Sequence, residues 1–389
     1  DGVLCFIAQN NWFTNSGAKI LRRKILNDSQ IQEINDFANY MIFDSADQQT
    51  MILMLSKNKI DNYSFKYSKV LSKDFTKKDL INFFNNHEND KMLLEDIKFE
   101  KKKYLEKYLV FSENKVEKVL DHIEKERNFI LKKNELSQGM VGPQETLKKT
   151  VWKEILKENE AYIPGEGIFF LNEIELKRLN LNKKEKELLK PAYIPEDLTK
   201  YFSKCDAKNY VIYTTSEFKN KNSMRDYPNL KKHFDKFKKI ITSDNKPYGL
   251  HRARNDFFFK DKKILCIRKC EDPFFSLIES DTYVFARFNI IKSSRINLEY
   301  LSILLNSDLV KFYLKNRGKM QGFNFQLDTE PLLKIPIKVP KKLKDYLEIF
   351  NKLKSNKIKI SELKKQTNKM IFDLYEISEK EIHIIKNDL

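Results

Sequence analysis

Residues 2–13 read GVLCFIAQNNWF, and this stretch decides which fold the sequence predicts. Its first half is an apolar run without a polar interruption, Val3 to Ile7, which is typical of a strand buried on both faces. Such strands lie inside parallel sheets that helices cover from above and below. Since only Asp1 and Gly2 precede the run, we expect its partner strands to be encoded before Asp1. We also expect one edge of the sheet to be bare or covered by a substitute.

The residues that follow continue this pattern. Residues 15–28 (NSGAKILRRKILND) carry an apolar stripe at helical spacing, which Ser16 is placed to cap. Residues 31–37 (IQEINDF) and 50–57 (TMILMLSK) each predict a strand. The order strand, helix, strand, turn, strand is that of the end of a doubly wound α/β domain, which we place at residues 1–60.

Changes in composition along the chain predict three further regions. Residues 61–130 are charged and carry apolar residues at three-to-four spacing, which predicts a helical connector. Residues 131–340 contain glycines, prolines and strand-like runs, which predict a mixed domain of helices and strands. Residues 341–389 have heptad-like spacing of Leu and Ile and predict C-terminal helices. The expected fold class is therefore α/β plus α+β.

The charge balance is the first indication of function. Lys and Arg total 73 against 55 Asp and Glu, which gives a formal net charge of +18. The excess is clustered, because residues 231–270 contain 13 Lys or Arg and 4 Asp or Glu. Such clustering is typical of proteins that bind a polyanion, most often nucleic acid, and a solvated lysine-rich face is the alternative.

The sequence also argues against several other classes. No apolar run approaches the ~18 residues of a membrane span, and the first residues do not form a signal peptide, so we expect a cytoplasmic protein without a membrane partner. We expect no metal site, because one Cys-x3-Cys pair lacks a second pair of ligands. Metalloprotease, phosphate-loop and serine-elbow motifs are absent. The cysteines are Cys5, Cys205, Cys266 and Cys270.

Several segments, in order, resemble the C-terminal part of adenine-specific DNA methyltransferases of the gamma class. The first two are similar to the last third of the catalytic domain, and the others to the target-recognition region and the helical tail. Their order is that of TaqI-type methyltransferases and of type IIG restriction–modification enzymes. The segments are 2–26, 34–55, 136–145 (LSQGMVGPQE), 165–179 (GEGIFFLNEIELKRL), 188–201 (LLKPAYIPEDLTKY), 227–237 (YPNLKKHFDKF), 262–269 (KKILCIRK), 300–340 and 367–386.

The resemblance implies a full enzyme that transfers a methyl group from S-adenosylmethionine to the exocyclic amino group of an adenine flipped out of duplex DNA. It implies that the cofactor-binding glycine motif and the Asn-Pro-Pro-Tyr/Phe loop lie upstream, since neither NPP nor DPP occurs in this sequence. We therefore expect no catalytic residue in this chain, no methylation by it alone and no tightly bound cofactor. Its expected partners are double-stranded DNA and the missing N-terminal methyltransferase region of the same polypeptide, with or without a nuclease.

Two alternatives stay open. A non-catalytic specificity subunit, like those of type I systems, fits residues 300–309 (YLSILLNSDL) and the long helix after them. Such subunits have no partial α/β sheet at their start, which argues against this alternative. A structural or RNA-associated basic protein is the other alternative, and it predicts no preference among duplex DNA sequences.

For the flipped base, the resemblance places Phe43 at the position of an aromatic residue that stacks on the adenine, with Tyr40 as a second possible platform. Stacking of this kind contributes about 1–3 kcal/mol per base. A core aromatic residue that ends a strand is the alternative interpretation of Phe43. Asn11 and Trp12 leave the carboxyl end of their strand, where such sheets bind ligands, so we predict that they line the mouth of the active site. A core position suits Trp12 equally well.

For DNA contacts, the first candidate is YGLHRARNDFFF at 248–259. Two arginines alternate there and should point to one side of an extended segment, where arginine can pair with guanine; a surface strand with ion pairs is the alternative. The second candidate is RGKMQGFNFQ at 317–326, which is otherwise a simple helix-to-strand turn. The lysines at 231–239 are suited to contact phosphates or to form a solvated helix face. Of Arg268 and Lys269, one should point inward and be paired. The predicted DNA-binding residues are His251, Arg252, Arg254, Asn255, Arg317, Lys319, Gln321, Asn324, Lys236 and Lys239.

Overall fold

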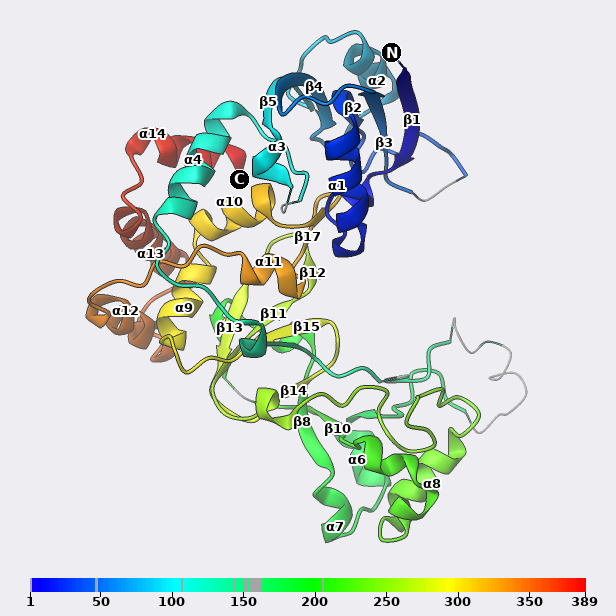
Figure 1. The fold of residues 1–389 in the computed structure, drawn as a ribbon. Coiled ribbons are helices and arrows are strands. Elements are labelled where there is room, and N and C mark those ends of the chain that lie inside the picture. The colour runs from blue at the N-terminus through cyan, green and yellow to red at the C-terminus, as the bar shows by residue number, and fades with distance from the viewer. Residues whose placement is uncertain are drawn as a thin grey trace.

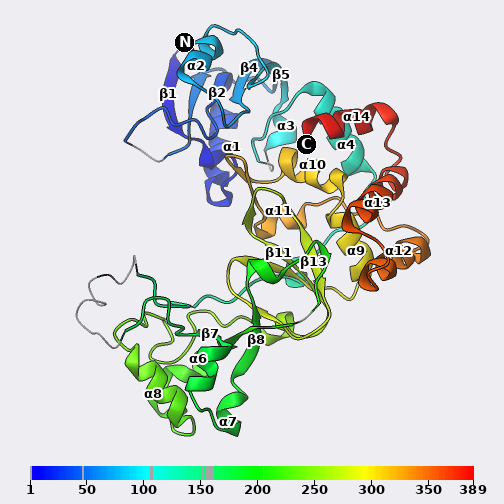
Figure 2. The same cartoon turned by 180° about the vertical axis from the view of Figure 1, so that it is seen from behind.

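The computed structural model describes residues 2–45, 48–105, 108–142, 144–149, 153, 162–204 and 206–389, so Cys205 lies outside this part. An N-terminal sheet, a central region built on smaller sheets and a C-terminal group of helices follow one another along the chain (Figures 1 and 2). The mixed fold class predicted from the sequence is confirmed. None of the helices in the described ranges combines the length and the apolar composition that crossing a membrane requires.

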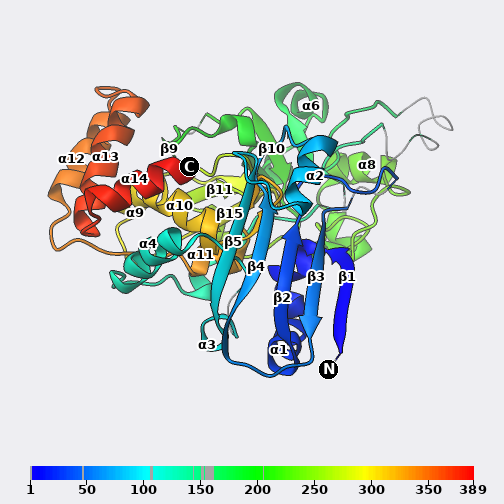
Figure 3. The same ribbon diagram turned by 90° about the horizontal axis from the view of Figure 1, so that it is seen from above.

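The N-terminal sheet, as far as the described residues go, consists of five strands in the order β1-β3-β2-β4-β5. They lie side by side in Figure 3. β3 is antiparallel to both β1 and β2, so these two run in the same direction, and β4 is parallel to β2. The carboxyl ends of β1, β2 and β4 therefore meet at one edge of the sheet. The bounds are β1 (Val3–Gln9), β2 (Gln30–Asp36), β3 (Thr50–Ser56), β4 (Asn62–Val70) and β5 (Met92–Glu100).

β1 is the edge strand of this sheet, and its partner among the described residues is β3 alone. Helix α1 (Lys19–Asp28) buries Leu26 in the sheet core, but Val3, Leu4 and Ile7 are 68%, 56% and 43% exposed. The prediction that the opening run is buried on both faces is therefore wrong in this chain. A strand with one neighbour leaves its other edge open, and the expected bare edge is present at β1.

Residues 61–130 are only partly the predicted helical connector. They contain α2 (Lys77–Phe84), α3 (Lys101–Tyr104) and α4 (Asn114–Lys125), but also β4 and β5, which extend the N-terminal sheet. The helical prediction is wrong for these two strands. In β4 the aromatic residues Tyr63, Phe65 and Tyr67 alternate with polar residues, which is the period of a strand. The high charge of the region hid this alternation.

The central region contains three sheets within the described ranges. Two of them are directly linked along the chain, because Arg268 alone separates β11 (Lys263–Ile267) of the first sheet from β12 (Lys269–Cys270) of the third. The first sheet has the order β6 (Leu136–Gln138), β15 (Phe288–Ile291), β11 (Lys263–Ile267), β13 (Phe275–Ile278) and β9 (Tyr201–Phe202). The second is β14 (Tyr283–Val284), β8 (Leu189–Tyr193), β10 (Asn209–Ile212) and β7 (Phe170–Asn172), near α6 (Glu173–Arg178), α7 (Lys183–Lys186) and α8 (Pro228–Lys236). The third is β12 (Lys269–Cys270), β17 (Asn324–Gln326) and β16 (Met320–Gln321).

The C-terminal helices pack against the central region through one large apolar core. This core joins α4, α9 (Leu298–Leu305) and α10 (Asp308–Arg317) with the last three helices. The helices predicted within 341–389 are confirmed, and the domain boundaries at 60, 130 and 340 stay predictions. The remaining bounds are α11 (Thr329–Leu333), α12 (Lys344–Lys354), α13 (Ile360–Leu374) and α14 (Glu379–Asp388).

Candidate nucleic-acid interface

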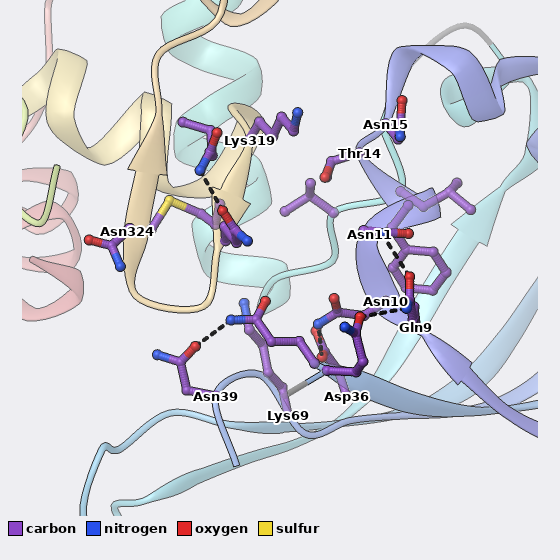
Figure 4. A pocket seen from close by; sticks show the side chains of 18 of the residues that line it. Gln9, Asn10, Asn11, Thr14, Asn15, Asp36, Asn39, Lys69, Lys319 and Asn324 are labelled. Carbon is purple, nitrogen blue, oxygen red and sulfur yellow. Dashed lines mark hydrogen bonds between the residues drawn. The ribbon is translucent and has the colours of Figure 1, made fainter. Parts of the chain in front are cut away.

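A cavity of about 550 Å³ lies where the carboxyl ends of β1, β2 and β4 face the hairpin β16–β17 (Figure 4). Its two walls come from segments far apart in the sequence, the N-terminal sheet and the third central sheet. In Figure 4, Lys319 and Asn324 of the hairpin region face Asn39, Asp36 and Lys69 of the sheet across this space. The carboxyl edge of an open α/β sheet is where such folds usually bind ligands.

Asp36, the last residue of β2, lines the cavity and is 8% exposed. Its Oδ1 accepts hydrogen bonds from Asn10 Nδ2 and from the backbone N–H of Ala38, each at 3.0 Å. Asn10 begins η1 (Asn10–Phe13), the short helix after β1, so the first contact joins the ends of two strands that run in the same direction. These bonds stabilise a carboxylate whose burial would otherwise be costly.

Amide side chains dominate the lining of the cavity. Gln49 Nε2 donates to Asn39 Oδ1 at 2.6 Å, and Gln326 Nε2 donates to Gln321 Oε1 at 2.7 Å. Each amide both donates and accepts, which is the combination that reads the edge of a base, as Asn and Gln do with adenine. The amide residues of the lining are Gln9, Asn10, Asn11, Asn15, Asn39, Gln48, Gln49, Gln321, Asn324 and Gln326.

The hairpin turn makes a close contact with the loop after β2. Gly322 has φ +60°, and a Cβ at this position would lie 1.5 Å from Asn39 Oδ1. The left-handed backbone there disfavours any other residue, and a Cβ would also require the Asn39 side chain to move. A second contact joins the third central sheet to the loop after β4, because Lys73 pairs with Glu271 at 3.0 Å and its ammonium lies 5.8 Å from the ring of Phe323. The hairpin thus positions the loop that carries Phe43.

The structure brings four of the predicted site residues together. Asn11, predicted for the mouth of the active site, lines the same cavity as Lys319, Gln321 and Asn324, which were predicted independently as DNA contacts. Trp12 is not among the lining residues and packs edge-on against Phe13, with ring centroids 4.6 Å apart. The core alternative therefore describes Trp12 better than the mouth does.

Phe43 lies in the loop between β2 and β3 and is 44% exposed. The alternative interpretation of Phe43 as a core aromatic residue is therefore wrong. Tyr40, earlier in the same loop, packs edge-on against Phe75 with ring centroids 5.1 Å apart. Of the two predicted platforms, Phe43 is the one whose ring is free of a ring partner among the described residues.

Arg317 corrects a prediction. Its side chain is 7% exposed, and its two terminal nitrogens donate to the Glu117 carboxylate at 2.8 and 2.7 Å. Burial alone would lower the pKa of Arg317, but Glu117 outweighs it and raises the pKa. The guanidinium therefore ties α10 to α4 and cannot contact DNA without breaking this pair. Arg317 was predicted as a DNA contact because it stands beside Gly318. The prediction is wrong because the end of α10 is buried, which the sequence does not reveal.

The 251–255 segment is not a regular extended strand. Arg254 has φ +68°, and its guanidinium donates to Gly139 O at 3.3 Å and to Gln138 Oε1 at 3.1 Å. The alternation rule does not apply through such a residue, and Arg254 is held by the protein itself. Arg252 is exposed and pairs with Val141 through its backbone only. His251 lies 3.3 Å from Asp244, and Asn255 caps the turn at Phe257.

The two lysines predicted near α8 differ. Lys236 Nζ pairs with Glu166 at 2.5 Å, whereas Lys239 is exposed and belongs to no ion pair within the described ranges. Of Arg268 and Lys269, the inward and paired residue is Arg268, which bonds Asp328 at 2.8 Å, while Lys269 is exposed and lines the cavity. The ammonium group of Lys236 is therefore held by an ion pair within the protein. The ammonium group of Lys239 is available to bind a phosphate.

Several lining residues were missed from the sequence. Asp36 and Asn10 could have been predicted as lining residues if the strand directions had been known. The carboxyl ends of parallel strands gather at one edge of the sheet. Lys69 was missed because residues 61–130 were interpreted as helical. Asn39 and Gln49 lie in an irregular loop, and no periodicity signals their role.

Two protein families match parts of the chain. Residues 190–337 match the TaqI-like C-terminal specificity domain, and residues 1–43 match the Eco57I restriction-modification methylase. Both matches agree with the resemblance seen in the sequence, one at each end of it. The cavity lies between them, because Asn10, Asn11 and Asp36 fall in the second range and Lys319, Gln321 and Asn324 in the first.

Among solved structures, the Type IIL restriction-modification enzyme MmeI in complex with DNA has a similar fold, with a TM-score of 0.58 and 11% identity. The match covers 97% of this chain and 47% of the MmeI chain. The type IIG restriction endonuclease BpuSI matches at a TM-score of 0.37 and 14% identity, over 96% of this chain and 47% of that one, too weakly to support a conclusion. The chain thus spans about half the length of both proteins. No curated protein matches the sequence.

Proposed function

We propose, on the premise that residues 190–337 form a TaqI-like C-terminal specificity domain, that the chain recognises a specific duplex DNA sequence. It would do so as part of an adenine-specific methyltransferase of the type IIG kind. The match of residues 1–43 to a methylase favours this over a non-catalytic specificity subunit. The DNA complex of MmeI, whose fold is similar, supports DNA as the partner.

The observation that carries the proposal is the amide-lined cavity between the strand ends and the β16–β17 hairpin. Methylation of a base requires its extrusion from the duplex, which costs a few kcal/mol. The exposed ring of Phe43, in the loop that begins at the cavity, could return about 1–3 kcal/mol by stacking. Donors and acceptors on both walls would then receive the polar edge of the base.

The cofactor of the full enzyme would be S-adenosylmethionine, as the methylase match suggests. The described residues that line the cavity do not fit it, because none of them is a glycine. The glycine-rich turn that approaches such a cofactor is absent from the sequence as well. Methylation by the chain alone is therefore not expected.

The upstream methyltransferase region would be the second partner. The open edge of β1 and the exposed Val3, Leu4 and Ile7 support this, because an unpaired apolar strand edge is a template for a further strand. A cytoplasmic location would follow from a DNA partner. An Asn-Pro-Pro-Tyr/Phe run in the upstream reading frame would support the methyltransferase assignment.

Filter binding of the 389-residue chain to duplex DNA over a salt series tests the proposal. We expect retention at low salt, with the logarithm of the binding constant falling linearly by about 0.9 per phosphate contact for each unit in the logarithm of the salt concentration. The reason is that each lysine or arginine on a phosphate releases condensed counterions. Absence of salt-dependent binding at low salt would contradict the proposal.

A further inference from the structure

Two lysines stand on opposite walls of the cavity. Lys69 stands at the carboxyl end of β4, and Lys269 lies on β12 of the third central sheet. Within the described ranges, the side chains of both are without an ion pair or a hydrogen bond. The other two lining lysines differ, because Lys319 pairs with Asp328 at 3.0 Å and Lys315 with Asp388 at 3.5 Å.

The charge around these two lysines is not balanced by the cavity itself. Of the described residues that line it, Asp36 is the only carboxylate, against four lysines. Asp36 is the register neighbour of Lys69 in the β2–β4 pair, yet it forms no ion pair with it, and its Oδ1 is engaged by Asn10 and Ala38. An anion that enters the cavity would therefore meet a net positive field with two ammonium groups available.

We propose that Lys69 and Lys269 bind the backbone phosphates on the two sides of the nucleotide that enters the cavity. A lysine ammonium is a compact charge suited to phosphate, and such contacts position DNA without reading its sequence. The lysines come from different parts of the chain, so the nucleotide would be held between the N-terminal sheet and the specificity domain. The inference rests on the proposed function and adds to it the residues that hold the extruded nucleotide.

Salt-dependent binding of the whole chain to one fixed duplex tests the inference. The variants are Lys69→Ala, Lys269→Ala and the double variant, each first shown to unfold in urea at the wild-type midpoint. Lys66→Ala is the matched control: it lies on the same strand, three residues from Lys69 and hence on the opposite face, and is exposed. We expect the magnitude of the salt slope to fall by about 0.9 in each cavity variant and by about 1.8 in the double variant, with no change for Lys66→Ala.

The outcomes separate the inference from the proposed function. If wild-type protein shows no salt-dependent binding, the proposed function fails and the inference falls with it. If wild type binds with a steep slope but the cavity variants keep that slope, the inference is overturned and DNA binding stands. In a second arm, inorganic phosphate replaces chloride at constant ionic strength. Thermal stabilisation by phosphate that the double variant loses, while its DNA slope is unchanged, would overturn the inference in favour of a free-anion site.

Discussion

Replacing Glu117 by glutamine is expected to lower the free energy of unfolding by about 3 kcal/mol at pH 7, because it leaves a buried guanidinium without the charge of its main partner. Glu117 is 16% exposed and accepts both bonds of Arg317, as well as a hydrogen bond from the Ser112 hydroxyl at 2.7 Å. The other carboxylates near Arg317, Asp121 and Glu124, are more distant, at 3.6 and 3.4 Å. Urea denaturation of the whole chain measures the change.

The same pair makes stability depend on pH in a defined direction. Burial alone would raise the pKa of Glu117, but the hydrogen bonds and charge of Arg317, together with Ser112 and Lys103, outweigh it and lower the pKa to about 2 from its ordinary value of 4.5. A carboxyl whose pKa is lower in the folded state stabilises fully above the unfolded pKa and loses that stabilisation as pH falls toward the folded pKa. The difference between wild type and Glu117→Gln should therefore shrink between about pH 5 and pH 2.

Glu348→Gln is the control for this prediction. Glu348 pairs with Lys344 at 3.8 Å on the exposed surface of α12, and such pairs contribute about 0.5 kcal/mol or less. If Glu117→Gln were no more destabilising than Glu348→Gln at pH 7, the structural role assigned to Arg317 would be wrong. Arg317 would then return as a candidate for DNA contact.

Replacing Arg252 by alanine is expected to weaken binding to the cognate duplex by about 5- to 150-fold, the equivalent of about 1–3 kcal/mol for one bidentate contact to a base. Binding to unrelated duplexes should change much less. Arg252 is exposed and its side chain has no hydrogen bond or ion pair within the described residues, so the fold should be unaffected. Competition binding with cognate and scrambled duplexes measures both affinities.

Two other arginines were considered for this experiment, one as a control and one as a second variant. Arg178→Ala removes an exposed arginine of α6 and serves as the matched control. Arg254 is unsuitable, because its guanidinium bonds Gln138 and Gly139 and its loss would disturb the fold. An equal loss of affinity for cognate and scrambled duplexes in Arg252→Ala would reassign Arg252 to a phosphate contact.

The strands near the start of the chain could be predicted because their signal is local. Val3 to Ile7 and the run at 50–57 contain their apolar pattern within a few residues, and the structure has strands there. The fold class followed from the order of such segments. β4 was not predicted, because the lysines and serines of this segment obscure the alternation of Tyr63, Phe65 and Tyr67 with polar residues.

The candidate site could be predicted only in pieces. Asn11 and Gln321 were chosen for separate local reasons, and their meeting in one cavity depends on how the hairpin docks on the sheet. Gly322 shows why the docking cannot be predicted from the sequence, because the side chain that it meets, Asn39, lies far away along the chain. The prediction for Arg317 was wrong for the same reason, since its partner Glu117 lies on another helix.

Selection of duplexes from a random pool by the 389-residue chain shows whether the protein recognises a specific DNA sequence, because it measures sequence preference and not only affinity. The chain would be incubated with the pool at moderate salt, and retained duplexes would be sequenced over successive rounds. Enrichment of one defined motif, bound at least 10³-fold more tightly than scrambled DNA as is typical of specific recognition, is the expected result. Retention of duplexes without any enriched motif would contradict the claim and leave a non-specific basic protein.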